Sequence, residues 1–454
     1  MIIDNFSAPR LVFFLNICYN LKYIIVEFRR NQACYGVVNM EAKPIFVCKR
    51  VVCPHCWHEF PPEEILAVSA CPDLLGDIHL GKFEQTRFLP SHFNVEGMPL
   101  DSRGYVCQQH ACPHCHLRIP DIILQTTSSF VSIVGAPASG KSYFLASMSY
   151  RLRTLLPNEF GFTFVDADPL MNMRLRNYES RQFENENLND IVALEKTEAE
   201  GDMYNSVNFD GQPVIFPQPF IFTLHNINNK ESDRGIRNLC LYDNAGESYI
   251  PGSDRADSPV TRHLGKSQAI FFLFDPMQDN NFRSACHDYS DDPQLNSSQL
   301  RSNMRQDAIF LEMAQRFRYL RHLSSTEKTN VPVIVIVTKF DIWQELLKDA
   351  PHPLPSPWKK GYGESTSQLD METIQYVSDY VRSALTAFTP AAPSMIESFS
   401  DNVLYVPVSA TGCAPEKDPE TGALGFRPGN LNPIWVEVPV LYFLHLKRLV
   451  SALN

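Results

Sequence analysis

The stretch GAPASGKS, at Gly135–Ser142, has the residue types and the spacing needed to bind a phosphate group. It matches the pattern G-x-x-x-x-G-K-[ST] and lies between an apolar strand-like run and a helix-like run. Glycines allow backbone N–H groups to surround a phosphate, and the N-terminus of the following helix adds a favourable dipole. Lys141 is expected to reach the β- and γ-phosphates, and Ser142 to bind Mg²⁺. The predicted nucleotide-binding residues here are Gly135, Ala136, Pro137, Ala138, Ser139, Gly140, Lys141 and Ser142.

Three short motifs follow the phosphate loop, and each comes at the end of a strand-like run. They read DNAG at Asp243–Gly246, TKFD at Thr338–Asp341 and VSATG at 408–412. Open α/β sheets bind their ligands at the carboxyl ends of the strands, so these motifs are expected to share one edge. Their order resembles the motif series of Ras-like and translation-factor-like GTPases.

That resemblance implies a guanine base. Asp341 would accept hydrogen bonds from the amino group and ring N–H of guanine, a donor pair that adenine lacks. Lys339 would pack its aliphatic part on the base, and the backbone N–H of Ala410 would meet the carbonyl oxygen of guanine. The predicted base-site residues are Thr338, Lys339, Asp341, Ser409 and Ala410. The competing prediction is an ATPase in which Asp275 holds Mg²⁺, but it leaves DNAG and TKFD without a role.

The DNAG motif also predicts groups for hydrolysis. Asp243 is expected to reach Mg²⁺ through water, and Gly246 to offer its N–H to the γ-phosphate. Glu247 stands where many related GTPases carry Gln, and its charge near the γ-phosphate predicts slow turnover. The predicted catalytic residues are Lys141, Gly246 and Glu247, and the predicted magnesium ligands are Ser142, Thr197 and Asp243.

A second kind of chemistry is indicated by CPHC, which occurs at Cys53–Cys56 and again at Cys112–Cys115. Four thiolates form a tetrahedral Zn²⁺ site, and each knuckle places two sulfurs at metal distance. The predicted zinc ligands are Cys53, Cys56, Cys112 and Cys115. A closed four-sulfur site is structural rather than catalytic, and a thiol–disulfide redox pair is the alternative. Cys71 and Cys107 could form a further thiol pair, and the neighbouring histidines are interpreted as solvent-facing, with metal ligation as the alternative.

These residues need a scaffold of alternating strands and helices. From Ser129 onward, apolar runs alternate with helix-like segments, which predicts an α/β fold with a mostly parallel sheet in three layers, of the P-loop (Ras-like GTPase) type. The polar segment Arg174–Gly211 is predicted as an inserted loop. The predicted domains are residues 1–39 as an N-terminal appendage, residues 40–125 as a zinc ribbon with an inserted loop, and residues 126–454 as a P-loop GTPase-like domain.

Composition excludes several other classes of protein. The chain has 454 residues, of which 44% are hydrophobic and 11% aromatic, so it is a folded protein. Its formal net charge of −11 argues against a protein that coats nucleic acid. The apolar run at 11–28 is interrupted by polar residues, which argues against a membrane span, with a single anchor as the alternative. Paired CPHC motifs indicate a reducing compartment and a bound metal.

The zinc ribbon with CPHC knuckles, the segments RFLPSHF and LDSRG, and then GAPASGKS, DNAGE, FLFDP and TKFD together resemble one bacterial group. It is the TRAFAC-clade GTPases of the double-GTPase family, found in conflict- and defence-type operons. The resemblance covers residues 45–450. It implies a cytoplasmic GTP/GDP switch with Mg²⁺ and Zn²⁺ that acts with a second GTPase-like protein or another copy of itself. A nucleotide-dependent scaffold without useful hydrolysis is the alternative.

Overall fold

The computed structural model describes most of the chain in two compact units. Unit 1 comprises Met1–Ser129, Val165–Asp168 and Asp202–Cys240, and unit 2 comprises Phe130–Phe164, Pro169–Gly201 and Leu241–Asn454. The described residues are 24–26, 34–39, 42–194, 204–227, 237–244, 246–249, 258–290, 292–296, 306–347, 351, 353–361, 363–419, 422 and 424–453.

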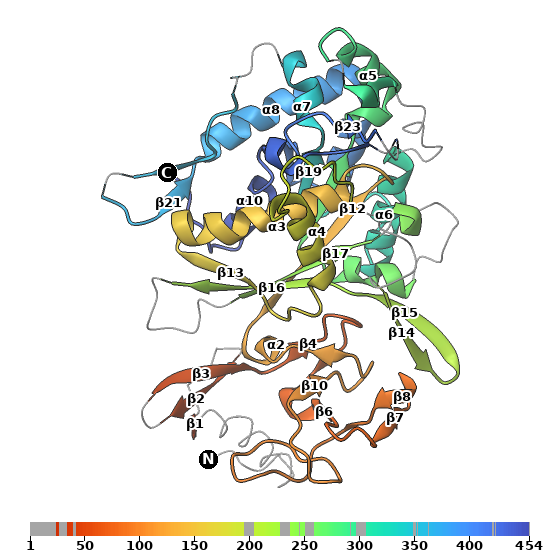
Figure 1. Cartoon of the computed structure of the whole chain (residues 1–454), viewed down its shortest axis with the longest axis vertical. Coiled ribbons are helices and arrows are strands. Elements are labelled where there is room, and N and C mark those ends of the chain that lie inside the picture. Colours follow the sequence, from red (N-terminus) through yellow and green to blue (C-terminus); the bar gives the residue numbers. More distant parts are fainter. Residues whose placement is uncertain are drawn as a thin grey trace. The chain divides into compact units, whose positions relative to one another are not determined.

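A seven-stranded sheet has the order β13-β16-β17-β12-β18-β19-β22 (Figure 1). Its strands are β12 Ser128–Gly135, β13 Phe162–Asp166, β16 Phe220–Asn226, β17 Arg237–Asp243, β18 Ala269–Phe274, β19 Val333–Val337 and β22 Val403–Pro407. Strands β12, β18, β19 and β22 pair in parallel. The chain leaves β12 toward one edge and later returns to build β18, β19 and β22 on its other side. The end of β12 is therefore the switch point at which such sheets bind ligands.

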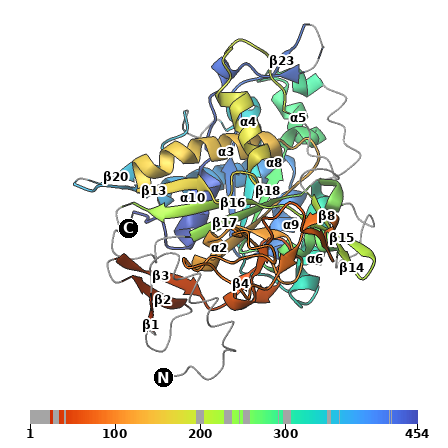
Figure 2. The same cartoon turned by 60° about the horizontal axis from the view of Figure 1, so that its bottom comes forward.

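Apolar runs form these strands because both faces of a parallel sheet are covered. All six residues of β18 and all five of β19 are buried. Phe310 of helix α6 (Gln306–Leu320) contacts Phe272 of β18 at 4.9 Å between ring centroids. Helix α3 (Lys141–Leu155) and α6 lie on opposite sides of the sheet (Figure 2). The structure thus confirms the predicted α/β fold with a mostly parallel sheet and helices on both faces.

The helices of unit 2 include several that the helix-like segments of the sequence predict and others, α4 among them, that they do not. They are α3 Lys141–Leu155, α4 Met173–Phe183, α5 Asn280–Cys286, α6 Gln306–Leu320, α7 Phe340–Trp343, α8 Met371–Phe388, α9 Ala391–Phe399 and α10 Val438–Leu446, with 3₁₀ turns η4 Gly246–Tyr249 and η5 Pro259–Gly265 among them. The prediction of a loop over Arg174–Gly211 is wrong at α4. The segment is polar and therefore resembles a loop, but one of its polar residues, Glu179, is buried and forms an ion pair with Arg153 of α3 at 3.0 Å.

Unit 1 is built from short strands. They include β1 Ile24–Val26, β2 Cys34–Asn39, β3 Ala42–Cys48, β4 Val51–Val52, β5 Glu59–Phe60, β6 Leu66–Val68, β7 Leu75–Asp77, β8 Gly81–Gln85, β9 Arg87–Phe88, β10 Gln109–Ala111 and β11 Arg118–Ile119, with the short helix α2 Ile122–Gln125. A hairpin of β14 Tyr204–Phe209 and β15 Gln212–Pro217 also belongs to this unit. At its tip, the N–H of Asn208 donates to the carbonyl of His79 at 2.7 Å.

None of the helices in the described ranges is long and apolar enough to cross a membrane.

Candidate nucleotide and metal sites

The phosphate loop connects β12 to α3, as the sequence predicts. Gly140 has φ 90°, a left-handed conformation that glycine adopts without strain, and it precedes the first helical residue, Lys141. Lys141 is buried, and its Nζ donates to the carbonyl oxygens of Gly135 and Ala136 at 2.9 and 3.0 Å. The ammonium group therefore lies over the loop and bonds to two of its carbonyl groups.

Gly246 of the DNAG motif lies directly against this loop. A Cβ atom added to Gly246 would stand 2.7 Å from Cδ of Pro137 and 2.8 Å from both the carbonyl oxygen of Gly135 and the nitrogen of Pro137. Distances under 3.0 Å essentially never occur for real Cβ atoms, so only glycine fits. The structure therefore brings two motifs that are about a hundred residues apart in sequence into direct contact.

The predicted base-site residues meet at the ends of β19 and β22. Ser409 Oγ donates to Asp341 Oδ1 at 2.5 Å, and the N–H of Gly412 donates to Ser409 Oγ at 2.7 Å. Burial raises the pKa of Asp341 to about 6. The carbonyl of Ala410 accepts from Ser147 Oγ of α3 at 2.6 Å, which fixes this loop to the helix that follows the phosphate loop.

Lys339 and Asp275 form a buried ion pair that the sequence did not reveal. Lys339 Nζ lies 2.7 Å from Asp275 Oδ2, and Lys339 has φ 58°, so its side chain leaves the backbone in a left-handed turn. Asp275 Oδ1 also accepts from the N–H of Met277 at 3.0 Å. Both carboxylate oxygens of Asp275, the residue that the ATPase prediction assigns to Mg²⁺, therefore accept hydrogen bonds within the protein.

Two predicted residues cannot be placed in this site. Thr197 lies outside the described residues. Glu247 belongs to the 3₁₀ turn η4, but its side chain is likewise outside what the structure describes. Asp243 ends β17 and is buried, and Ser142 lies in the first turn of α3.

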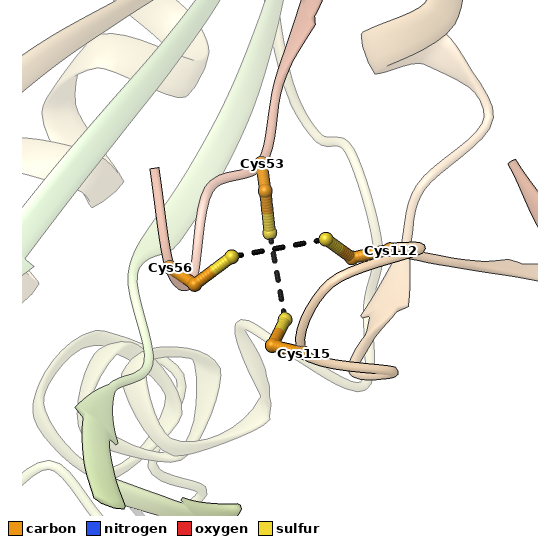
Figure 3. Close-up of side chains that lie close together, drawn as sticks. All are labelled: Cys53, Cys56, Cys112 and Cys115. Atoms are coloured by element: carbon orange, nitrogen blue, oxygen red, sulfur yellow. Dashed lines mark hydrogen bonds between the residues drawn. The ribbon is translucent and has the colours of Figure 1, made fainter. Parts of the chain in front are cut away.

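The four knuckle cysteines form one cluster in unit 1 (Figure 3). The Sγ atoms of Cys53 and Cys115 are 3.8 Å apart, and those of Cys56 and Cys112 are 3.7 Å apart. A tetrahedral zinc ion with Zn–S bonds of about 2.3 Å requires sulfur–sulfur distances of about 3.8 Å. The cluster has the dimensions of a zinc site before any metal is added.

The two knuckles share the same backbone geometry. In the first, the N–H of His55 donates to Cys53 Sγ at 3.3 Å; in the second, the N–H of His114 donates to Cys112 Sγ at 3.3 Å. Such N–H···S contacts stabilise a thiolate. Hydrogen bonds from the neighbouring cysteines, Cys115 first, lower the pKa of Cys112, so one sulfur of the cluster already favours the charged form.

The interpretation of the knuckle histidines as solvent-facing is wrong for two of the four. His55 is buried, and its Nε2 lies 3.0 Å from the carbonyl oxygen of Arg118. His116 is also buried and pairs with Asp77 at 2.8 Å. Each ring is thus taken up by a partner within the protein, Arg118 for His55 and Asp77 for His116. His58 and His114 are exposed and stack on each other at 4.7 Å between ring centroids.

Cys71 and Cys107 are both buried and lie outside the four-sulfur cluster.

Two buried polar contacts near DNAG have no signal in the sequence. Arg316 of α6 is fully buried, and its Nη1 donates to the carbonyl of Ser248 at 2.9 Å, which ties the turn η4 to α6. Asn244, the second residue of DNAG, bonds to His263 of η5. Only the spacing of Glu312 and Arg316, one helical turn apart, could have suggested an ion pair.

Comparison with known proteins gives similarities to parts of the chain. No protein-family model matches it. The chain is 27% identical over 182 residues to the putative ESX-1 scaffolding and assembly protein SaeC of Mycolicibacterium smegmatis, covering 39% of this chain and 40% of that protein.

Three solved structures of GTP-binding proteins are also similar to part of the chain. Sup35 complexed with GDP aligns with a TM-score of 0.21 and 10% identity, over 63% of this chain and 38% of that one. Elongation factor SelB from Methanococcus maripaludis with GppNHp gives 0.20 and 11%, over 63% and 30%. Era with MgGDPNP and a 16S ribosomal RNA segment gives 0.22 and 13%, over 63% and 52%. In every case the alignment spans less than two thirds of the other protein, so the function proposed below rests on this chain's own residues.

Proposed function

We propose that this protein is a GTP-binding switch that hydrolyses GTP slowly and carries a structural zinc ribbon. The observation that carries the proposal is the contact of Gly246 with Pro137. It places the backbone of DNAG against the phosphate loop, where a γ-phosphate would be sensed. The pairing of Asp341 with Ser409 supplies the base site on the same edge of the sheet.

Mg²⁺ fits the residues at this edge. Ser142 follows β12 and Asp243 ends β17, and these two strands are neighbours in the sheet. A hydroxyl and a carboxylate are oxygen donors of the kind that Mg²⁺ prefers. When bound, Mg²⁺ would neutralise charge that develops on the phosphate oxygens.

The chain's own residues would then act by binding and orientation. Lys141 would exchange the carbonyls of Gly135 and Ala136 for phosphate oxygens, and Gly246 would donate its N–H to the γ-phosphate. Asp341 would accept from guanine in its charged form. Lys339 is held by Asp275, which leaves its aliphatic carbons to face the base.

Speed depends on Glu247. A carboxylate at this position could accept a proton from the attacking water, but its negative charge would lie near the γ-phosphate and oppose that role. Single-turnover hydrolysis of GTP by wild type, Glu247→Gln and Lys141→Ala tests the proposal. We expect the Gln variant to match or exceed wild type and the Ala variant to lose hydrolysis. Equal rates of hydrolysis by wild type and Lys141→Ala would contradict the proposal that the protein is a GTPase. Efficient competition by ATP for the GTP site would contradict the proposed preference for guanine.

The zinc ribbon would be structural, because four cysteines leave no open position for a substrate. The family resemblance also suggests a cytoplasmic role in a bacterial conflict or defence-type system, with a second GTPase-like protein or another copy of the chain as partner. A pull-down from native cells with the GTPγS-loaded and GDP-loaded protein would identify a partner that depends on the nucleotide.

A nucleotide-dependent scaffold is the second candidate. It is favoured by the partial similarity to SaeC, which is described as a scaffolding and assembly protein. Binding of GTP without turnover, together with partner assembly that GTPγS and GTP support equally, would favour the scaffold over the switch.

A further inference from the structure

A closed network of buried hydrogen bonds joins the DNAG loop to β12. Asn244 Nδ2 lies 2.9 Å from both the carbonyl oxygen of Val260 and Nε2 of His263. His263 Nδ1 lies 2.5 Å from Ser132 Oγ. Ser132 Oγ contacts Ser267 Oγ, which donates to the carbonyl of His263 at 2.9 Å. Ser132, Asn244, His263 and Ser267 have no exposed surface.

The direction of every bond in this network follows from its ends. Only an N–H can bond to the carbonyl of Val260, so the amide nitrogen of Asn244 faces that way and also donates to His263 Nε2. Nε2 is then an acceptor, and the ring proton sits on Nδ1, which donates to Ser132. The hydroxyl of Ser132 donates to Ser267. Each of these hydrogens is used, and one tautomer of His263 fits all of these bonds, while Oδ1 of Asn244 has no hydrogen-bond partner among the described residues.

The same network requires a neutral imidazole. A second ring proton on Nε2 would face the N–H of Asn244, and two donors repel. Burial lowers the pKa of His263 to about 3, so the ring stays neutral at physiological pH. The ring also stacks on Tyr242 of β17, with centroids 4.8 Å apart and planes 8° from parallel.

We propose that His263 is a positioning residue that fixes the DNAG loop relative to the phosphate loop. Its ring bonds on one side to Ser132, three residues before Gly135 in β12, and on the other to Asn244, between Asp243 and Gly246. One side chain therefore sets the register of the two segments whose contact carries the proposed function, and the inference rests on that function.

The expected consequence is specific to the γ-phosphate. Gly246 would contact only the third phosphate, so a loosened DNAG loop should weaken the binding of a triphosphate more than that of a diphosphate. A residue with a purely structural role would change both affinities together. The ratio of the dissociation constants for GDP and GTPγS is therefore the informative measurement.

Two variants of His263 separate the two sides of the network. In His263→Gln the side-chain amide reaches the position of Nε2 and can accept from Asn244, whereas in His263→Asn it reaches only the position of Nδ1, toward Ser132. Both are uncharged and both lose the stacking on Tyr242. We expect the Gln variant to keep the ratio within about twofold of wild type. The Asn variant should lower it about tenfold, the effect of one buried hydrogen bond.

Ser149→Ala is the matched control, because this buried hydroxyl of α3 bonds only within its helix, to Leu145 and Ala146. If neither His263 variant folds, Asn244→Ala removes the same bond from the loop side and should lower the ratio by the same factor. Nitrogen NMR of the wild-type imidazole should show the Nδ1–H tautomer without titration between pH 5 and 8.

Equal ratios of the GDP and GTPγS dissociation constants in the Gln, Asn and wild-type proteins would contradict the proposed role of His263. An Nε2–H tautomer would contradict it as well, and neither result would affect the proposed function. A wild-type protein that binds neither nucleotide would overturn the proposed function and this inference with it.

Discussion

The substitution Gly246→Ala adds one methyl group at the contact between DNAG and the phosphate loop. Its Cβ would stand 2.7 Å from Cδ of Pro137 and 2.8 Å from two backbone atoms, against at least 3.4 Å for an ordinary contact. The shortfall is 0.6–0.7 Å (3.4 less 2.8, and 3.4 less 2.7). Because two of the three obstructing atoms are backbone, no rotation of a flexible side chain can relieve the clash. Either DNAG or the phosphate loop has to move.

The change in nucleotide affinity depends on which of the two loops moves to relieve the clash. Added methyl groups in well-packed sites cost about 1–3 kcal/mol, which corresponds to a loss of affinity of roughly 5-fold to 150-fold if the bound state bears the strain. Ligand contacts should restrain the phosphate loop, so DNAG should move away and carry the N–H of residue 246 with it. We expect GTPγS affinity to fall by that factor and GDP affinity to change by less than about threefold.

Isothermal titration with GDP and with GTPγS measures both affinities on the same protein. Gly265→Ala is the control, because its added Cβ would stand 3.3 Å from Cβ of Leu320, only 0.1 Å (3.4 less 3.3) short of an ordinary contact. Unchanged binding of both nucleotides by Gly246→Ala would show that the contact is not formed when nucleotide is bound. An equal loss for both would show that the clash acts on the phosphate loop rather than on γ-phosphate sensing.

Other predictions test the remaining parts of the two sites. Asp341 must be charged to accept from guanine, and burial raises its pKa to about 6, so GDP affinity should fall as pH drops through 6, by about tenfold at pH 5. Asp341→Asn should bind GDP weakly at every pH, and a wild-type affinity that is flat between pH 7 and 5 would contradict this role. Cys115→Ser should lose the bound zinc measured by plasma mass spectrometry, whereas Cys413→Ser should keep it; zinc retained in both would place the metal elsewhere. Arg316→Met leaves both the carboxylate of Glu312 and the carbonyl of Ser248 without their partner and should lower the free energy of unfolding in urea by ~3 kcal/mol. A variant as stable as wild type would show that Arg316 does not hold η4.

The parts of this structure that are visible in the sequence are those with a local chemical requirement. A phosphate loop needs its glycines and lysine within eight residues, and a zinc knuckle needs two cysteines at fixed spacing. The pattern therefore locates Lys141 and Cys53 directly. The ends of the apolar runs at Asp243 and Asp341 likewise locate the sheet edge, because parallel strands are recognisable as continuous hydrophobic runs.

The contacts that hold these groups in place are not visible in the same way. Asn244 and His263 are 19 positions apart, and Lys339 and Asp275 are 64 apart, so no periodicity links either pair. The choice of partner depends on how η5 and α7 pack on the sheet, which is a property of the whole fold. Helix α4 was missed for a related reason: its buried Glu179 is satisfied by an arginine from another helix.

The contacts of the turn η4 bear on the cause of the expected slow hydrolysis of GTP. The turn η4 is fixed at its beginning by the packing of Gly246 on Pro137 and near its end by the bond from Arg316 to the carbonyl of Ser248. The backbone on either side of Glu247 is therefore held by contacts within the protein. If the turn is already in place, slow hydrolysis cannot be attributed to the ordering of this backbone. It would have to come from the side chain itself, from its charge beside the γ-phosphate. In that case exchanging the carboxylate for an amide should change the rate without changing the affinity for GTP.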